Sequence, residues 1–103
     1  MALEESLIEI ISLSGEVKKK FLEAVKHAKN NEKEKAEKVF NEADDKLITA
    51  HLKQTDLIKK EAGGEKIESS LLLTHAQDHL MTAILLKDMA KEFMDLYERL
   101  DEK

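Results

Sequence analysis

Apolar and small residues recur along the chain at steps that alternate between four and three, the spacing that keeps one face of an α-helix toward a partner. The first stretch comprises Leu3, Leu7, Ile10, Ser14, Val17, Phe21, Ala24 and Ala28. The second comprises Ala36, Phe40, Ala43, Leu47, Ala50, Gln54 and Leu57. The third comprises Leu72, Ala76, His79, Ala83, Leu86, Ala90, Phe93, Tyr97 and Leu100. The pattern predicts three amphipathic helices.

Polar and glycine residues mark the expected helix ends. Asn30-Asn31 ends the first helix, because asparagine tolerates left-handed geometry, and Gly63-Gly64 is a C-terminal cap signal for the second. Ser69 or Ser70 stands near the start of the third. Short connections force neighbouring helices to run antiparallel. We therefore expect an all-α, antiparallel up-down-up three-helix bundle, with residues 1–103 forming a single domain.

The third stretch carries more apolar surface than such a bundle can bury. Further apolar residues are spread around most of its circumference: Leu71, Leu73, Leu80, Met81, Ile84 and Leu85. A helix that is apolar nearly all round is buried on more than one side, and a bundle this small has no interior to cover it. We expect a homo-oligomer with the third helix inside it, but the pattern does not choose between dimer and trimer.

Composition agrees with helices and narrows the range of partners. The 103 residues include no proline and three glycines, so few residues interrupt a helix. The net charge of −5 argues against nucleic acid as a partner. Two groups of lysines, Lys18 to Lys20 and Lys33, Lys35 and Lys38, have glutamates among and beside them at helical spacing. This spacing predicts a solvated, ion-paired helix face rather than a basic footprint.

The sequence gives no sign of export or membrane insertion. The N-terminus lacks the regions of a signal peptide, and apolar runs such as Leu71-Leu72-Leu73 are far too short to span a bilayer. The absence of cysteine excludes disulfide and thiolate chemistry and is compatible with a reducing compartment. We expect a cytoplasmic protein without direct membrane insertion.

A polar group interrupts the apolar third stretch, in the run His75-Ala76-Gln77-Asp78-His79. At about 100° per residue, His79 lies about 40° from His75 around a helix, and Asp78 lies about 60° away on the other side. Two imidazoles and a carboxylate therefore share one patch of helix surface.

This patch has three interpretations. Its residues can be structural side chains of a non-catalytic helical oligomerisation module. Alternatively, His75, Asp78 and His79 can be ligands of a metal-binding helical protein, although the inverted zinc-protease motif has Glu where Asp78 stands. The third interpretation is phosphohistidine chemistry, because neutral imidazole is a nucleophile near neutral pH and a second histidine can bond the phosphoryl oxygens. Spacing alone does not separate the last two.

Three segments together resemble one family. The run from Thr74 to Thr82, which contains His-Ala-Gln-Asp-His, is similar to the active-site segment of the lactose/cellobiose-type IIA subunits of the sugar phosphotransferase system. The segment from Ile10 to Glu16 resembles the glycine segment of the family's first helix. The segment from Ala50 to Ile58 resembles its Ala-His-x-x-Gln-Thr block.

The resemblance implies a transferase that forms a phosphohistidine intermediate during sugar uptake. His75 is expected to accept a phosphoryl group from the phosphocarrier protein HPr and to pass it to a cysteine of a sugar-specific IIB subunit or domain. His79 is then a supporting residue. Gln77 has two open interpretations: it supports the site by orienting a ring or binding a phosphate oxygen, or it only satisfies backbone groups in the interface. We expect His51 to pack near the site rather than to act as a second nucleophile, and His27 to lie on the surface. The sugar stays open among lactose, cellobiose and chitobiose, because a IIA subunit never touches it.

The resemblance also implies a homotrimer, in which Asp78 from each subunit meets the others at the threefold axis around a divalent cation. Carboxylates that meet where water is scarce repel each other unless they are protonated or bound to a cation. Mg²⁺, which prefers oxygen ligands, is our first choice for this metal.

Overall fold

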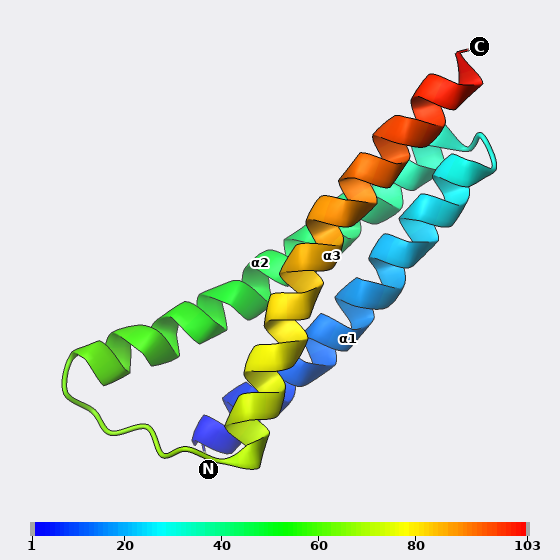
Figure 1. Ribbon diagram of the computed structural model, residues 1–103. Coiled ribbons are helices and arrows are strands. Elements are labelled where there is room, and N and C mark those ends of the chain that lie inside the picture. The colour runs from blue at the N-terminus through cyan, green and yellow to red at the C-terminus, as the bar shows by residue number, and fades with distance from the viewer. Residues whose placement is uncertain (1, 103) are drawn as a thin grey trace.

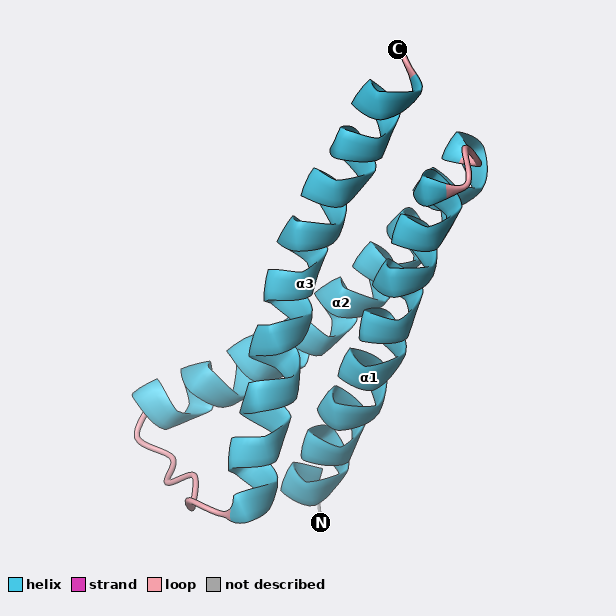
Figure 2. Ribbon diagram, turned by 45° about the vertical axis from the view of Figure 1, so that its right-hand side comes forward, coloured by secondary structure: helices cyan, strands magenta, loops and turns pink. Residues whose placement is uncertain are grey.

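Three helices form an elongated bundle in the computed structural model, which describes residues 2–102 (Figure 1). They are α1 (Ala2–Lys29), α2 (Lys33–Ala62) and α3 (Leu71–Asp101). Loops join them, and residues 2–102 contain no strand (Figure 2). α1 and α3 point the same way and α2 runs antiparallel to both, in a bundle 56 Å long and 20 Å across. The predicted all-α, up-down-up three-helix fold is confirmed.

The helix ends carry the residues that the sequence indicated. Asn31, after α1, has a left-handed backbone with a φ of 62°, and Gly64, after α2, has a φ of 101°. The hydroxyl of Ser70 caps α3 by accepting a hydrogen bond of 3.0 Å from the N–H of Leu73. Such caps satisfy backbone groups that a helix leaves unpaired at its ends.

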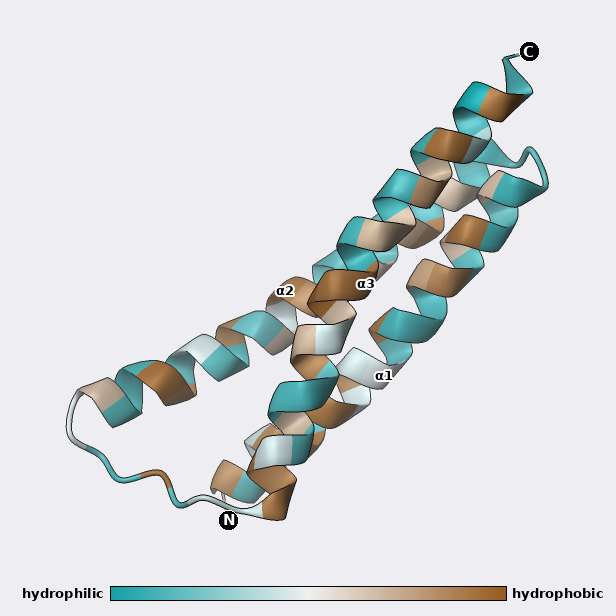
Figure 3. Ribbon diagram, viewed as in Figure 1, coloured by the Kyte–Doolittle hydropathy of each residue, from teal (hydrophilic) through white to brown (hydrophobic). Residues whose placement is uncertain are grey.

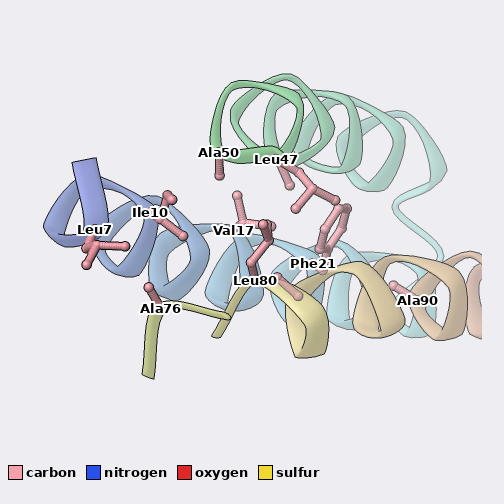
Figure 4. Close-up of a cluster of buried hydrophobic side chains, with 11 residues drawn as sticks. Leu7, Ile10, Val17, Phe21, Leu47, Ala50, Ala76, Leu80 and Ala90 are labelled. Atoms are coloured by element: carbon pink, nitrogen blue, oxygen red, sulfur yellow. The ribbon is translucent and has the colours of Figure 1, made fainter. Parts of the chain in front are cut away.

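The core lies where the three helices meet, around Phe21 and Leu80 (Figure 4). Phe21 is fully buried and packs against the ring of Phe40, with ring centroids 5.1 Å apart. Much of the remaining core is alanine, which lets the helices approach closely: Ala24, Ala43, Ala50, Ala76, Ala83 and Ala90. The positions predicted for the inner face of the first helix, from Leu7 to Ala28, are all buried.

Two positions predicted for the inner face of the third helix lie on the surface instead. Phe93 and Leu100 are 43% and 53% exposed, whereas Leu80, outside the predicted stripe, is fully buried. A strict seven-residue repeat drifts by about 20° per repeat on a straight α-helix. The series that starts at Leu72 therefore turns gradually away from the core and emerges at Phe93.

The predicted surplus of apolar surface on α3 is present. Hydrophobic residues are distributed over the whole length of this helix (Figure 3). Its large exposed apolar side chains are Leu71, Met81, Leu85, Met89, Phe93, Leu96 and Leu100. Within residues 2–102, none of the helices combines the length and the apolar character that crossing a bilayer requires.

The C-terminal half of α2 leans away from the other two helices (Figures 1 and 2). α1 contacts both of its neighbours extensively, whereas α2 and α3 touch each other much less. Near this end, Leu57 of α2, Ile67 of the connecting loop and Leu73 of α3 line a shallow depression. The N-terminal half of α3 is therefore supported mainly by α1.

Candidate functional site on α3

His75 and His79 lie one turn apart on the N-terminal half of α3. Their rings are perpendicular, with centroids 4.5 Å apart, so the structure brings the two predicted histidines together. His75 is exposed and His79 is half-buried. An open depression beside them is lined by Leu71, Thr74, His75 and Asp78, which leaves the His75 ring accessible to a large partner.

Lys18 of α1 reaches this site. Its Nζ lies 3.1 Å from Nδ1 of His79. An ammonium group can only donate hydrogen bonds, so Nδ1 of His79 must accept, which places the ring proton on Nε2 of a neutral imidazole. The contact joins α1 directly to α3, because these two helices lie side by side here.

The prediction of a solvated, ion-paired lysine face holds for Lys33 and Lys35, which pair with Glu98 and Glu32, but it is wrong for Lys18. Lys18 is half-buried, and none of the ion pairs formed within residues 2–102 includes it. Its neighbour Lys20 does form a long-range pair, 4.0 Å from Glu42 of α2, and Lys19 is exposed. The physical reason is position, since Lys18 flanks the buried stripe of α1 on the side that faces α3. The sequence feature that could have indicated this placement is the position of Lys18 directly after the core residue Val17.

Burial is the main cause that lowers the pKa of His79 below its ordinary value. The nearby Lys18 ammonium and the His75 ring lower this pKa further, whereas the Asp78 carboxylate raises it. The net direction favours the neutral ring, in agreement with the hydrogen bond that Nδ1 accepts.

Gln77 is not brought to the histidines within one chain. Its Oε1 accepts a hydrogen bond from Nε2 of Gln54 in α2. Gln77 lies about 200° from His75 around the helix, so its side chain faces the opposite side of α3. The supporting role assigned to Gln77 stays a prediction, and the contact that the structure provides is a link between two helices.

Asp78 is exposed beside His75, and no ion pair formed within residues 2–102 includes it. Among the described residues, no group of three or more histidine, aspartate or glutamate side chains is arranged to hold a metal ion. One chain alone therefore does not gather a three-ligand site from His75, Asp78 and His79.

The other two histidines lie away from His75 in this chain. His51 is exposed and lines a depression with Ile84 and Asp88, on the side of α3 that faces α2. The expected packing of His51 near the site is not seen within one chain. His27 is half-buried rather than on the open surface, and its Nδ1 lies 3.0 Å from Oε1 of Glu32, where it ties the end of α1 to the following loop.

An accessible imidazole beside a neutral second imidazole, on an open helix face, suits a group carrier that meets large partners in turn. Comparison with known proteins agrees. Residues 5–98 match the family described as the lactose/cellobiose-specific IIA subunit of the phosphotransferase system, and the chain belongs to this family. The predicted family and its class of activity, a phosphotransferase component, are confirmed.

Individual relatives cover nearly the whole chain. The lichenan-specific phosphotransferase enzyme IIA component of Bacillus subtilis is 45% identical over 101 residues, which is 98% of this chain and 92% of that protein. The crystal structure of the cellobiose-specific enzyme IIA from Bacillus anthracis superposes with a TM-score of 0.96 at 42% identity, covering 100% of this chain and 94% of that one. The chitobiose IIA protein of Escherichia coli, solved as a complex with HPr, has a TM-score of 0.84 at 37% identity, with 96% of each chain covered.

Proposed function

We propose that His75 is the residue on which this chain carries a phosphoryl group, received from HPr and passed to a sugar-specific IIB subunit. The observation that carries this proposal is the exposed His75 ring packed perpendicular to His79 at 4.5 Å. The solved complex of a relative with HPr supports HPr as the donor. The cysteine of IIB as the acceptor follows from the family resemblance.

The transfer needs one free ring nitrogen on His75. The lone pair of that nitrogen attacks phosphorus, an N–P bond forms on His75, and the N–P bond of the donor histidine breaks, returning its electron pair to the donor ring. The other nitrogen of His75 keeps its proton. In the next step an S–P bond forms on the cysteine thiolate of IIB while the N–P bond of His75 breaks.

An open helix face is sufficient for this chemistry. Phosphoryl transfer depends on positioning and on charge stabilisation more than on covalent machinery, so each partner can complete the site when it docks. Such docking is expected to be transient and small in area. Within this chain, His79 supplies a neutral ring whose N–H can bond a phosphoryl oxygen.

Intact mass after incubation with phosphoenolpyruvate, enzyme I and HPr tests the assignment. One phosphoryl group should appear on the wild-type protein and none on His75→Ala, whereas His27→Ala and His51→Ala should be labelled normally. His79→Ala should accept phosphate more slowly. Label that remains on His75→Ala would show that another residue is the acceptor. A wild-type protein that takes up no phosphate would favour the oligomerisation module.

We also propose that the chain functions as a homotrimer assembled along α3. Leu71 and Leu85 are 87% and 61% exposed, and Asp78 lies between them on the same helix face, within about 40°. A stripe of this kind along a long helix is typical of the seam between copies packed in parallel. A trimer places three copies of Asp78 near one axis.

The Asp78 carboxylates would hold a divalent cation at that axis, and Mg²⁺ fits best. Carboxylate oxygens are the ligands that a hard divalent ion prefers, and the remaining positions would be filled by water. Asp78 is exposed on the apolar stripe, so burial between subunits would otherwise leave three like charges together. The ion would be a structural tie between subunits and would take no part in the transfer.

A further inference from the structure

Lys18 of α1 and the two histidines of α3 form a series of contacts that joins the two helices. The Lys18 ammonium donates to Nδ1 of His79, 3.1 Å away, and the His79 ring stands perpendicular to that of His75. The two nitrogens of an imidazole point in widely different directions. Because Nδ1 of His79 faces Lys18, Nε2 points away from Lys18 and can serve another partner.

We infer that Lys18 is a positioning residue for phosphoryl transfer, which fixes the His79 proton on Nε2 so that this N–H donates to the phosphoryl group on His75. The inference rests on the proposed function of His75. Lys18 itself neither loses a proton nor forms a bond to phosphorus in the transfer. It acts through His79.

The surroundings of Lys18 distinguish it from an ordinary surface lysine. It is half-buried, and the ion pairs formed within residues 2–102 leave it out, although Lys20 pairs with Glu42. A partly buried ammonium is costly without a hydrogen-bond acceptor. The fold provides His79 as this acceptor. The Lys18 ammonium therefore bonds a ring of the candidate site and not a carboxylate.

Loss of this contact should change what His79 offers to the phosphoryl group. Without Lys18, the imidazole can place its proton on either nitrogen, and in one of the two tautomers an unprotonated Nε2 lone pair would face the phosphoryl oxygens. That tautomer cannot donate and repels the oxygens. A fixed donor, by contrast, stabilises negative charge on the transferring group without reorganisation.

The test compares Lys18→Met with Lys18→Arg, which keeps a cation, and with Lys19→Met, which removes one charge from the exposed neighbour. Nitrogen-15 NMR of the His79 ring reports its tautomer, and rapid mixing with phospho-HPr reports the transfer rate. Wild type and Lys19→Met should show protonated Nε2 and equal rates. Lys18→Met should show mixed tautomers and transfer that is about tenfold slower, the effect of losing one charge-assisted hydrogen bond. Lys18→Arg should restore much of both.

A double-mutant cycle separates positioning from a direct effect of the lysine charge on docking. In a His79→Ala background, Lys18→Met should cause no further loss of rate, because the lysine acts through the missing ring. An unchanged His79 tautomer in Lys18→Met, an unchanged transfer rate, or full additivity in the cycle would each overturn the inference. If the wild-type chain accepts no phosphate at all, the proposed function fails, while the NMR comparison still decides whether Lys18 sets the tautomer.

Discussion

Gln54 of α2 donates a hydrogen bond to Gln77 of α3 on the side of α3 opposite His75. Gln54 is 7% exposed, so removing its partner would leave a buried amide without that hydrogen bond. We predict that Gln77→Ala lowers the free energy of unfolding by about 1–3 kcal/mol, while phosphate uptake at His75 continues. Urea unfolding and intact mass measure the two effects.

The matched variant Gln54→Ala should lose a similar amount of stability, and the two substitutions together should cost less than their sum. In the opposite pattern, Gln77→Ala would leave the free energy of unfolding unchanged and would abolish phosphate uptake. This pattern would place Gln77 in the transfer site, as the family resemblance implied, by way of another copy of the chain.

Two glycines should respond in opposite ways to alanine. A Cβ atom at Gly15, inside α1, would meet no atom within 4 Å, whereas Gly64 has a φ of 101°. Gly15→Ala should raise the free energy of unfolding by about 0.5–1 kcal/mol, because alanine is the better helix residue. Gly64→Ala should lower it, because alanine does not tolerate that backbone geometry. Urea unfolding gives both values. A loss of stability in Gly15→Ala would indicate that another chain approaches this glycine closely.

The loop between α1 and α2 should make stability depend on pH. Hydrogen bonds from His27 and Lys35 hold the pKa of Glu32 below its ordinary value of 4.5. The unfolded chain therefore binds more protons in this range, and the stability that Glu32 contributes is complete above pH 4.5 and is lost as the pH falls through the folded value. Glu32→Gln should melt below wild type at neutral pH, and the gap should close in acid. A gap that stays constant across this range would show that the loop contacts do not depend on the charge of Glu32.

HPr and IIB should dock on the same face. Both must bring a reacting atom to the ring of His75, which is exposed on α3. Chemical-shift mapping with each partner should give overlapping footprints centred on the N-terminal half of α3 and extending to Lys18 of α1. Footprints on opposite sides of the bundle would contradict a carrier that serves both partners from one histidine.

The sequence predicted the fold and the pair of histidines well, because both depend on spacing within single helices. His75 and His79 are four residues apart on one helix, so their proximity needs no knowledge of the other two. The surface positions of Phe93 and Leu100 were missed because the apolar pattern was extended as a strict seven-residue repeat along a straight helix.

Contacts between helices were harder to predict. Lys18 and His79 are 61 positions apart, and their meeting depends on the axial offset between α1 and α3, which an apolar pattern does not set. Gln77 faces Gln54 because α2 lies on that side of α3. A bundle of the opposite handedness has the same apolar pattern and would exchange the neighbours on the two sides of α3.

The assembly prediction turns on Asp78. If three chains pack along the exposed stripe of α3, Asp78 is the charged residue between Leu71 and Leu85, and its carboxylates meet where water is scarce. Chelation at neutral pH should weaken the trimer, and acid that protonates the carboxylates should restore it. Sedimentation with and without EDTA measures the change.

Asp78→Leu should remove both the repulsion and the need for an ion. Replacing buried charges by apolar side chains of similar size often stabilises an assembly by about 1–4 kcal/mol, so this variant should stay trimeric in EDTA under conditions in which the wild-type trimer dissociates. Asp88→Leu is the matched control, because Asp88 is exposed on α3 but lies on the side toward α2, away from the stripe. It should dissociate in EDTA as wild type does. A wild-type monomer at micromolar concentration with Mg²⁺ present would refute the trimer. A trimer indifferent both to EDTA and to Asp78→Leu would refute only the ion, leaving the apolar stripe as the sole source of the assembly.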